Sequence, residues 1–142
     1  MSFRLLLPIF LAMVTSYSFA ETIKTYDGFD IYYSIVPSTF ISGEIADRYK
    51  IIRGKDRSFL NVAIVGKTGS AVEADIVGSI KNLLDQTQDL AFRKVKEGNA
   101  IYYLHELKHS DDELLRFSAQ IALPNGRLEK LMFSKKLYWN DE

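Results

Sequence analysis

The feature that most constrains this chain is an alternation of apolar and polar residues with a period of two. In the segment 29–35 the odd positions are all apolar or aromatic: Phe29, Ile31, Tyr33 and Ile35. Side chains of a strand point alternately to opposite faces, so this pattern predicts a strand with one buried face. Before it, the pair Asp27-Gly28 favours a tight hairpin turn. After it, Pro37 lacks the N–H needed to continue a ladder of hydrogen bonds.

The same kind of pattern recurs along the chain with turn signals between the segments. Residues 58–66 are apolar on both faces, which predicts a central strand that is covered on both sides. Residues 90–109 predict a hairpin that turns at Glu97-Gly98-Asn99, and residues 113–123 and 127–139 predict two strands around a tight turn at 124–126. The expected fold is therefore all-β and mainly antiparallel, an immunoglobulin-like β-sandwich.

One short helix is expected after the first long strand. Ser42 can cap the N–H groups of a first turn, and Glu44 suits the positive end of a helix. Ile45 and Tyr49 are four residues apart and would meet on one helix face. We therefore predict a helix of about two turns here.

The segment 72–84 fits two structures. Ser70 and Glu73 have the spacing of a capping box, which favours a helix. Apolar residues nevertheless alternate from Val72, and Gly78 together with several β-branched residues disfavours a helix. Strand is the preferred interpretation, and helix stays open as the alternative.

The first twenty residues have the order of a secretory signal peptide. Arg4 precedes an apolar run from 5 to 14, and Ser18 and Ala20 are small residues at the positions that a signal peptidase reads. The run is shorter than the roughly 20 residues that span a bilayer. We expect residues 1–20 to be a signal peptide that is cut between Ala20 and Glu21, leaving a single β-sandwich domain over residues 21–142.

Composition narrows the possible partners. The chain contains no cysteine, so an exported product has no disulfide and depends on its apolar core for stability. Without Arg4, 17 basic side chains face 18 acidic ones, and the charges are mixed along the chain. We therefore expect no binding to nucleic acid. No segment after Glu21 is apolar enough to predict stable insertion into a membrane.

Two motifs that could indicate a cofactor or a metal have simpler interpretations here. The run "VGKTGS" at 65–70 resembles the end of a phosphate-binding loop, but the first glycine of that motif would fall at Asn61 inside a strand. His105 and His109 would lie about 13 Å apart on a strand with a rise of ~3.3 Å per residue, too far to share one metal ion. They are expected at the surface or rim. We predict no catalytic residue, no metal site and no cofactor.

The candidate binding surface starts from the stretch "IYYSIVPSTF". Tyr32 faces away from the predicted core, and beyond Pro37 the hydroxyls and backbone of the next residues would be free to meet a partner unless the short helix covers them. One of Tyr102 and Tyr103 is expected to face outward in the same way. A cross-strand pair of tyrosines is the favoured interpretation, and an aromatic binding strip is the alternative. The predicted binding residues are Tyr32, Ser38, Thr39 and Phe40.

Several stretches together resemble a known family: "YYSIVPSTFISGEIADRY", "LNVAI", "NLLDQ" and "EGNAIYYLHEL" followed by "ELLRF". The chain is similar to a family of small exported gammaproteobacterial proteins that is catalogued only as a domain of unknown function. It differs at Gly43, where the family pattern usually has proline. The resemblance implies a periplasmic address and favours strand for the segment from Val72. It brings no catalytic residues with it.

These observations favour a non-enzymatic periplasmic module that binds an envelope protein or peptide, because strand edges can accept an extended segment. The alternative is a carrier of a small molecule or lipid, with aromatic side chains lining a cavity between the sheets. A hydrolase built from scattered polar residues is the least favoured class.

Export generates the first testable prediction. When the full chain is expressed with its own N-terminus, the periplasmic product should begin at Glu21, because Ser18 and Ala20 provide the small residues before the cut. Mass spectrometry of that product measures this directly. A product that retains Met1, or that remains in the cytoplasm, would contradict the prediction.

Overall fold

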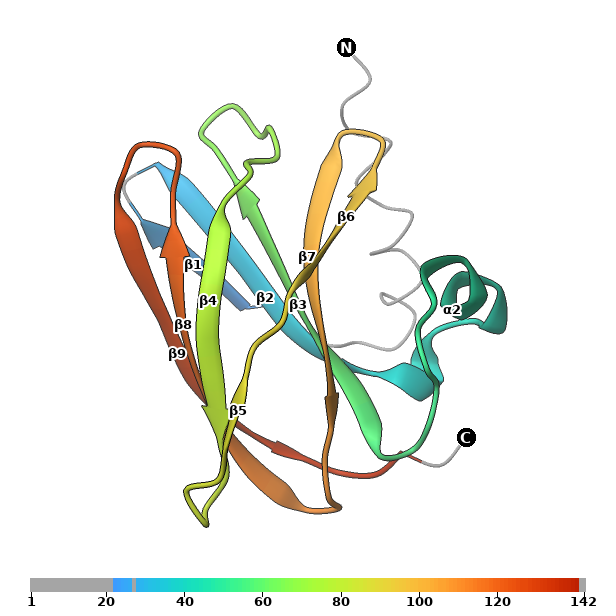
Figure 1. The fold of residues 1–142 in the computed structure, drawn as a ribbon. Helices are drawn as coiled ribbons and strands as arrows, with labels where there is room; N and C mark the ends of the chain where they lie inside the picture. Colours follow the sequence, from blue (N-terminus) through green and yellow to red (C-terminus); the bar gives the residue numbers. More distant parts are fainter. Residues whose placement is uncertain (1–21, 27, 141–142) are drawn as a thin grey trace.

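The computed structural model describes residues 22–26 and 28–140, which form two packed antiparallel sheets (Figure 1). The first sheet has the order β1-β2-β3-β7-β6. The second has the order β5-β4-β8-β9. The bounds are β1 Thr22–Tyr26, β2 Phe29–Pro37, β3 Arg57–Val65, β4 Asp75–Lys81, β5 Thr87–Asp89, β6 Arg93–Glu97, β7 Ala100–Lys108, β8 Glu113–Ala122 and β9 Leu128–Leu137. The predicted signal peptide, its cleavage site and Asp27 lie outside the described residues.

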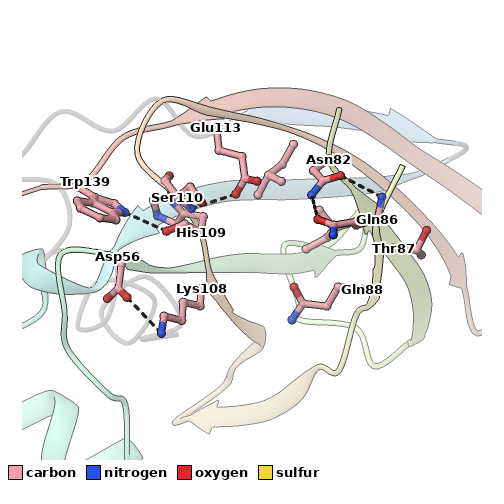
Figure 2. A pocket seen from close by; sticks show the side chains of 12 residues that line it. Asp56, Asn82, Gln86, Thr87, Gln88, Lys108, His109, Ser110, Glu113 and Trp139 are labelled. Carbon is pink, nitrogen blue, oxygen red and sulfur yellow. Dashed lines mark hydrogen bonds and ion pairs between the residues drawn. The ribbon is translucent and has the colours of Figure 1, made fainter. Parts of the chain in front are cut away.

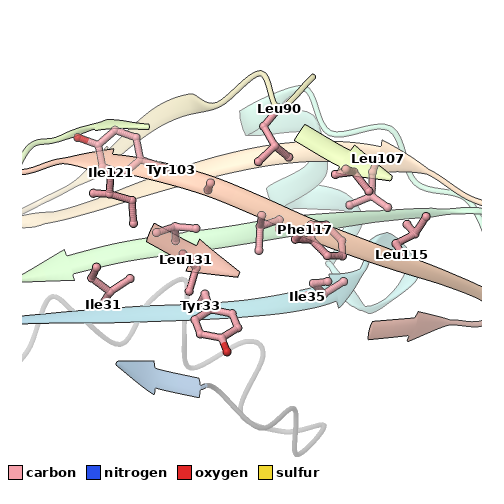
Figure 3. Close-up of a cluster of buried hydrophobic side chains, with 14 of the residues drawn as sticks. Ile31, Tyr33, Ile35, Leu90, Tyr103, Leu107, Leu115, Phe117, Ile121 and Leu131 are labelled. Carbon is pink, nitrogen blue, oxygen red and sulfur yellow. The ribbon is translucent and has the colours of Figure 1, made fainter. Parts of the chain in front are cut away.

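Alternating side chains from both sheets fill the space between them, which confirms the predicted β-sandwich. On β2, Ile31, Tyr33 and Ile35 point into this interior, and Phe29 packs partly against it. The rings of Tyr33 and Phe133 stack with centroids 4.5 Å apart, and Phe133 stacks in turn on Phe117 at 4.6 Å. Figure 3 shows the cluster from within, with side chains of β2, β7 and β8 converging. The period of two therefore predicted the inner face correctly.

The central strand β3 is buried on both faces, as its sequence predicts. Leu60, Val62 and Ile64 belong to the cluster between the sheets. Phe59 lies on the other face, in a second cluster that also contains Ile45 of the helix α2 (Gly43–Tyr49). In Figure 1 this helix lies on the side of the first sheet that faces away from β4, β8 and β9. The two sheets thus differ, because α2 covers part of the outer face of the first one.

The helix α2 is stabilised by the capping and charge interactions that its sequence predicts. Ser42 has extended backbone angles, and its hydroxyl oxygen accepts a hydrogen bond from the N–H of Ile45 at 3.3 Å. Glu44 stands in the first turn and Arg48 in the last, where each charge favours the helix dipole. Lys50 ends the helix in the left-handed conformation, with a φ of 55°.

The ambiguous segment is a strand, β4, so the preferred interpretation is confirmed. Gly78 explains why a helix-like capping signal does not prevail. A Cβ at Gly78 would overlap the carbonyl oxygen of Ser118 and lie 2.7 Å from the Cα of Ala119 on the neighbouring strand β8. The absence of a side chain therefore lets β4 and β8 approach closely.

After β5 the chain leaves the second sheet and joins the first at β6, passing across one side of the sandwich (Figure 1). We call residues 90–92 the crossover segment. Leu90 is buried in the interior, and its N–H donates to the carbonyl of Gly78 at 2.9 Å. Phe92 packs partly against the same interior. The crossover segment thus closes this side of the core.

The structure corrects the expectation that one of Tyr102 and Tyr103 is outward. Tyr102 does lie on the outer face of the first sheet, yet it is buried there in the cluster that includes α2, and Tyr103 is buried between the sheets. Neither tyrosine is therefore outward in the sense predicted. In contrast, the run at 65–70 is the expected turn, closed by hydrogen bonds between Gly66 and Ser70 and between Gly69 and Gly66.

Among the described residues, none of the helices is both long enough and apolar enough to cross a membrane.

The faces of β2 give a stability prediction. Tyr33→Ala should lower the free energy of unfolding by ~3–5 kcal/mol, because it removes a ring that is stacked in the core. Tyr32→Ala should cost less than about 1 kcal/mol, because Tyr32 is half-buried on the opposite face and loses only cross-strand contacts. Urea unfolding of the two variants side by side measures both. Equal losses would show that the face assignment is wrong.

Candidate functional site

The four residues of the predicted binding surface do not form one patch. Ser38 is 2% exposed, and its hydroxyl both accepts from the N–H and donates to the carbonyl of Gly54, each at 2.9 Å. Ser38, Thr39 and Phe40 form a short 3-10 turn. Tyr32 lies six residues earlier along β2, which places it about 20 Å away at ~3.3 Å per residue.

The backbone of this turn is also engaged, contrary to the expectation that it would be free. The carbonyl of Ser38 accepts from the N–H of Ile41 at 3.2 Å, and the carbonyl of Thr39 accepts from the guanidinium of Arg53 at 3.0 Å. Ser38 is therefore a structural residue that fixes the loop before β3. A binding role for Tyr32, Thr39 and Phe40 stays a prediction.

The two histidines are buried, which corrects their expected place at the surface or rim. His105 is 3% exposed and points into the core from β7. Its Nδ1 accepts a hydrogen bond from the backbone N–H of Ala91 in the crossover segment at 2.9 Å. Its Nε2 is buried and has no hydrogen-bond partner among the described residues. Burial lowers the pKa of His105, against the opposing effects of the Ala91 backbone and the Glu106 charge.

His109 follows the end of β7 and is 5% exposed. Its Nδ1 lies 2.9 Å from the carbonyl oxygen of Ser110, which can only accept, so Nδ1 donates there. Its Nε2 then accepts the hydroxyl of Ser58 at 3.0 Å. Both ring nitrogens are thus used inside the fold. The described residues contain no group of three or more histidine, cysteine or acidic side chains that could hold a metal ion.

One hollow, which we call the end cleft, has a volume of about 440 Å³ and lies at one end of the sandwich (Figure 2). One wall is formed by the turn between β4 and β5, with Asn82 and Gln86, and by β5 itself, with Thr87 and Gln88. The opposite wall follows β7 and carries Lys108, His109, Ser110 and Glu113, together with Asp56 and Trp139. Ile80 and Leu115 of the core complete the lining.

Trp139, just beyond β9, is fixed from several sides. Its indole N–H donates to the carbonyl of His109 at 2.9 Å, and its backbone N–H donates to a carboxylate oxygen of Asp111 at 2.9 Å. The ammonium of Lys55 lies over the ring, 4.8 Å from its centroid. The side chain is nevertheless 41% exposed. The end of the chain therefore places a rigid aromatic ring at the rim of the end cleft.

A second hollow, which we call the side pocket, has a volume of about 590 Å³. It lies beyond the other end of the crossover segment and is lined by residues before and within β4, by Phe92 and Lys94, by Tyr103 and by residues 122–124. Its apolar lining includes Ile76, Phe92 and Leu123. Tyr103 is held in place because its hydroxyl accepts the N–H of Ala74 at 2.9 Å.

Charged side chains stand at the rim of the side pocket. Glu73 forms ion pairs with Lys94 at 3.2 Å and with Lys96 at 3.0 Å. These two lysines lower the pKa of the Glu73 carboxyl, and the hydrogen bond from Lys96 has the largest effect. Asp75 is exposed and has no ion pair within the described part of the chain.

Sequence reasoning missed both hollows, because their walls come from segments that are far apart in the chain. One signal was present for the end cleft: Trp139 is the single tryptophan of the sequence. No comparable local signal marks Gln88 or Asp75.

The model of the family described as a domain of unknown function, DUF4426, matches residues 23–140. The chain belongs to the DUF4426 family. The resemblance found in the sequence is thereby confirmed. A DUF4426 family protein from Pseudomonas aeruginosa PAO1, known from a crystal structure, is 28% identical. The likeness has a TM-score of 0.76 and covers 85% of this chain and 97% of that one.

Two more distant structures share the fold. FetP from uropathogenic Escherichia coli strain F11, recombinantly expressed in the periplasm, is 12% identical with a TM-score of 0.62 over 88% of this DUF4426 chain and 99% of that one. A copper-bound variant of FetP from the same strain is 12% identical with a TM-score of 0.60 over 85% and 97%. At this identity the likeness concerns the fold alone. A comparison with curated proteins finds no significant match.

Burial of His105 gives a pH prediction. Its pKa is lowered in the folded state, so between that value and the unfolded value near 6.5 the unfolded chain binds more protons. The contribution of neutral His105 to stability is therefore complete above about pH 6.5 and is lost as the pH falls toward the folded pKa.

The matched control is His105→Asn, whose side-chain oxygen can still accept the N–H of Ala91 but does not titrate. Urea unfolding between about pH 7.5 and 5.5, a range that brackets the ordinary pKa of histidine, should show a steeper loss of stability for the natural chain than for this variant. Parallel pH dependences would contradict the assigned role of His105.

Proposed function

We propose that this DUF4426 protein is an exported, non-enzymatic module that binds an envelope protein or peptide, and that its side pocket receives an apolar anchor side chain of that partner. The observation that carries the proposal is the chemistry of the pocket, in which apolar walls are surrounded by charged groups. Protein partners are commonly held by such an arrangement, in which a buried anchor lies within a polar rim.

The pocket is preorganised for such an anchor. Tyr103 is fixed by the N–H of Ala74, and Phe92 is fixed beside the His105 ring at a centroid distance of 6.0 Å. Because these walls are already ordered, binding costs little side-chain entropy there. The unpaired carboxylate of Asp75 favours a partner with a basic group next to its apolar anchor.

Strand addition at an open edge is less favourable than the side pocket as a binding mode. Lys24 stands on edge strand β1, and Lys94 and Lys96 stand on edge strand β6. The edge strand β9 carries Lys130 and Lys135, while the edge strand β5 has three residues. Lysines and short strands are the usual means by which proteins prevent an edge from pairing with another chain.

The proposal assigns no catalytic activity because the one serine–histidine pair described above is buried. Ser58 and His109 are hydrogen-bonded like a nucleophile and its base, but Ser58 is only 4% exposed. A nucleophile must reach its substrate. The Ser58 hydroxyl is not part of the lining of the end cleft or of the side pocket.

A carrier with an aromatic-lined cavity between the sheets fits less well. The aromatic residues Tyr33, Phe117 and Phe133, which point between the sheets, stack on one another within the core. Their surfaces are therefore used for packing, and the two hollows described above have charged or amide groups in their linings.

The test uses a photo-reactive amino acid in place of Lys94, an exposed residue of the pocket lining, in the full chain expressed in intact cells. We expect one dominant adduct with a protein or peptide that mass spectrometry identifies, and no such adduct from the same probe at Asp47, an exposed residue of α2. Asp75→Lys should remove the adduct, because it places a positive charge next to the basic group of the partner. Asp47→Lys makes the same change on α2, outside the lining of the pocket, and should leave the adduct in place.

Both reversals are at exposed positions, where ion pairs contribute only about 0–1 kcal/mol, so the fold should tolerate them. Equal adducts from the probes at Lys94 and Asp47, or an adduct that survives Asp75→Lys, would refute the proposal.

A further inference from the structure

We propose that the end cleft is a binding site for a neutral saccharide, whose hydroxyl groups are held by amide and carboxylate side chains beside Trp139. This inference goes beyond the partner binding proposed above, since it concerns another surface and another class of ligand.

The turn between β4 and β5 presents amide groups whose hydrogen-bonding capacity is not used up. Asn82 organises the turn: its side-chain oxygen accepts the N–H groups of Leu84 and Gln86 at 3.0 Å, and its amide nitrogen donates to the side-chain oxygen of Gln86 at 2.7 Å. The amide nitrogen of Gln86 is left with two N–H groups to donate. Gln88 makes no side-chain hydrogen bond within the described residues and lines the cleft directly.

The opposite wall supplies acceptors. One carboxylate oxygen of Glu113 accepts the N–H of Ser110 at 3.0 Å, and the other oxygen remains available. Asp56 forms an ion pair with Lys108 at 3.6 Å. A sugar hydroxyl both donates and accepts, so it is best satisfied where amides and carboxylates lie on facing walls. Figure 2 shows Gln86 and Gln88 on one side of the hollow and Asp56 and Glu113 on the other.

The charges around the cleft nearly cancel. Asp56 and Glu113 are opposed by Lys108, and Lys55 lies close by over the ring of Trp139. A phosphate or another anion would meet two carboxylates, and a cation would meet two lysines. An uncharged ligand is repelled by neither the carboxylates nor the lysines, which favours a neutral saccharide over a charged one.

Trp139 adds an apolar surface that is already fixed. The C–H groups of a ligand can pack against the indole ring, while the indole N–H donates to the carbonyl of His109. Because Asp111, His109 and Lys55 hold the residue, little freedom is lost when a ligand packs on it. A sugar ring, with hydroxyls at its edge and C–H groups on its faces, matches this combination.

Size and wall chemistry argue against an extended peptide in this cleft. Its volume of about 440 Å³ lies within the ~300–1,000 Å³ of small-molecule sites. An extended peptide is normally held through its main chain by a strand edge. Among the strands that line the cleft, β5 is at the edge of its sheet and has only three residues, and the groups described above are side chains.

The single tryptophan makes the test specific to the site. The probes are the β-1,4-linked tetramer of N-acetylglucosamine and maltotetraose, with tetraalanine as the peptide probe, each titrated into the protein purified after expression of the full chain. We expect a saturable change in tryptophan fluorescence with at least one saccharide and none with tetraalanine. Gln88→Ala should weaken that binding about threefold to tenfold, as for one neutral hydrogen bond.

The matched control is Gln120→Ala, an exposed glutamine on the outer face of β8, which should bind like the natural chain. The side chain of Gln88 makes no hydrogen bond within the described part of the fold, so its replacement leaves stability unchanged. The proposal is overturned by no saturable response to either saccharide up to about 10 mM, a level above the millimolar Kd of a weak site. A response to tetraalanine alone, or equal affinity in Gln88→Ala, also overturns it.

Discussion

The hydrogen bond between the N–H of Ala91 and Nδ1 of His105 fixes the part of the chain on which both hollows depend. The imidazole of His105 is buried and the hydrogen bond is partly buried, so its loss would cost up to about 1–3 kcal/mol. The crossover segment that it anchors carries the chain from one sheet to the other. Residues 86–88, just before it, line the end cleft, and residues 92 and 94 line the side pocket. A single neutral imidazole therefore sets the position of one wall in each hollow.

The strands could be predicted from sequence because the alternation of side chains is a local property. On β2 each side chain points to the same face as the side chains two residues before and after it. The prediction that Tyr33 lies in the core was therefore correct. Burial of polar and outer-face residues was mispredicted for the opposite reason. His105 is buried beside the crossover segment, where it accepts the N–H of Ala91, fourteen residues earlier, and Tyr102 is buried in a cluster that includes α2. Neither cause can be read from the residues beside them.

The candidate sites were harder to predict than the fold. The sequence places Tyr32 and Ser38 close together, but an extended strand separates them, and Ser38 serves the loop at Gly54. In the end cleft, Asp56, Gln88 and Trp139 come from three separate parts of the chain. Their meeting depends on the strand order of both sheets, which alternation does not specify. Only the rarity of tryptophan in the sequence pointed toward this end of the molecule.

The double burial of β3 has a consequence for how the chain reaches its structure. β3 pairs with β2, which precedes it closely, but also with β7, which begins at Ala100. Such distant pairings slow folding, because a long loop must close before any contact is gained. Until β7 has been synthesised, a strand with apolar residues on both faces has an open edge. Incomplete chains are therefore the species most exposed to aggregation, and a chaperone that holds them unfolded would protect this strand first.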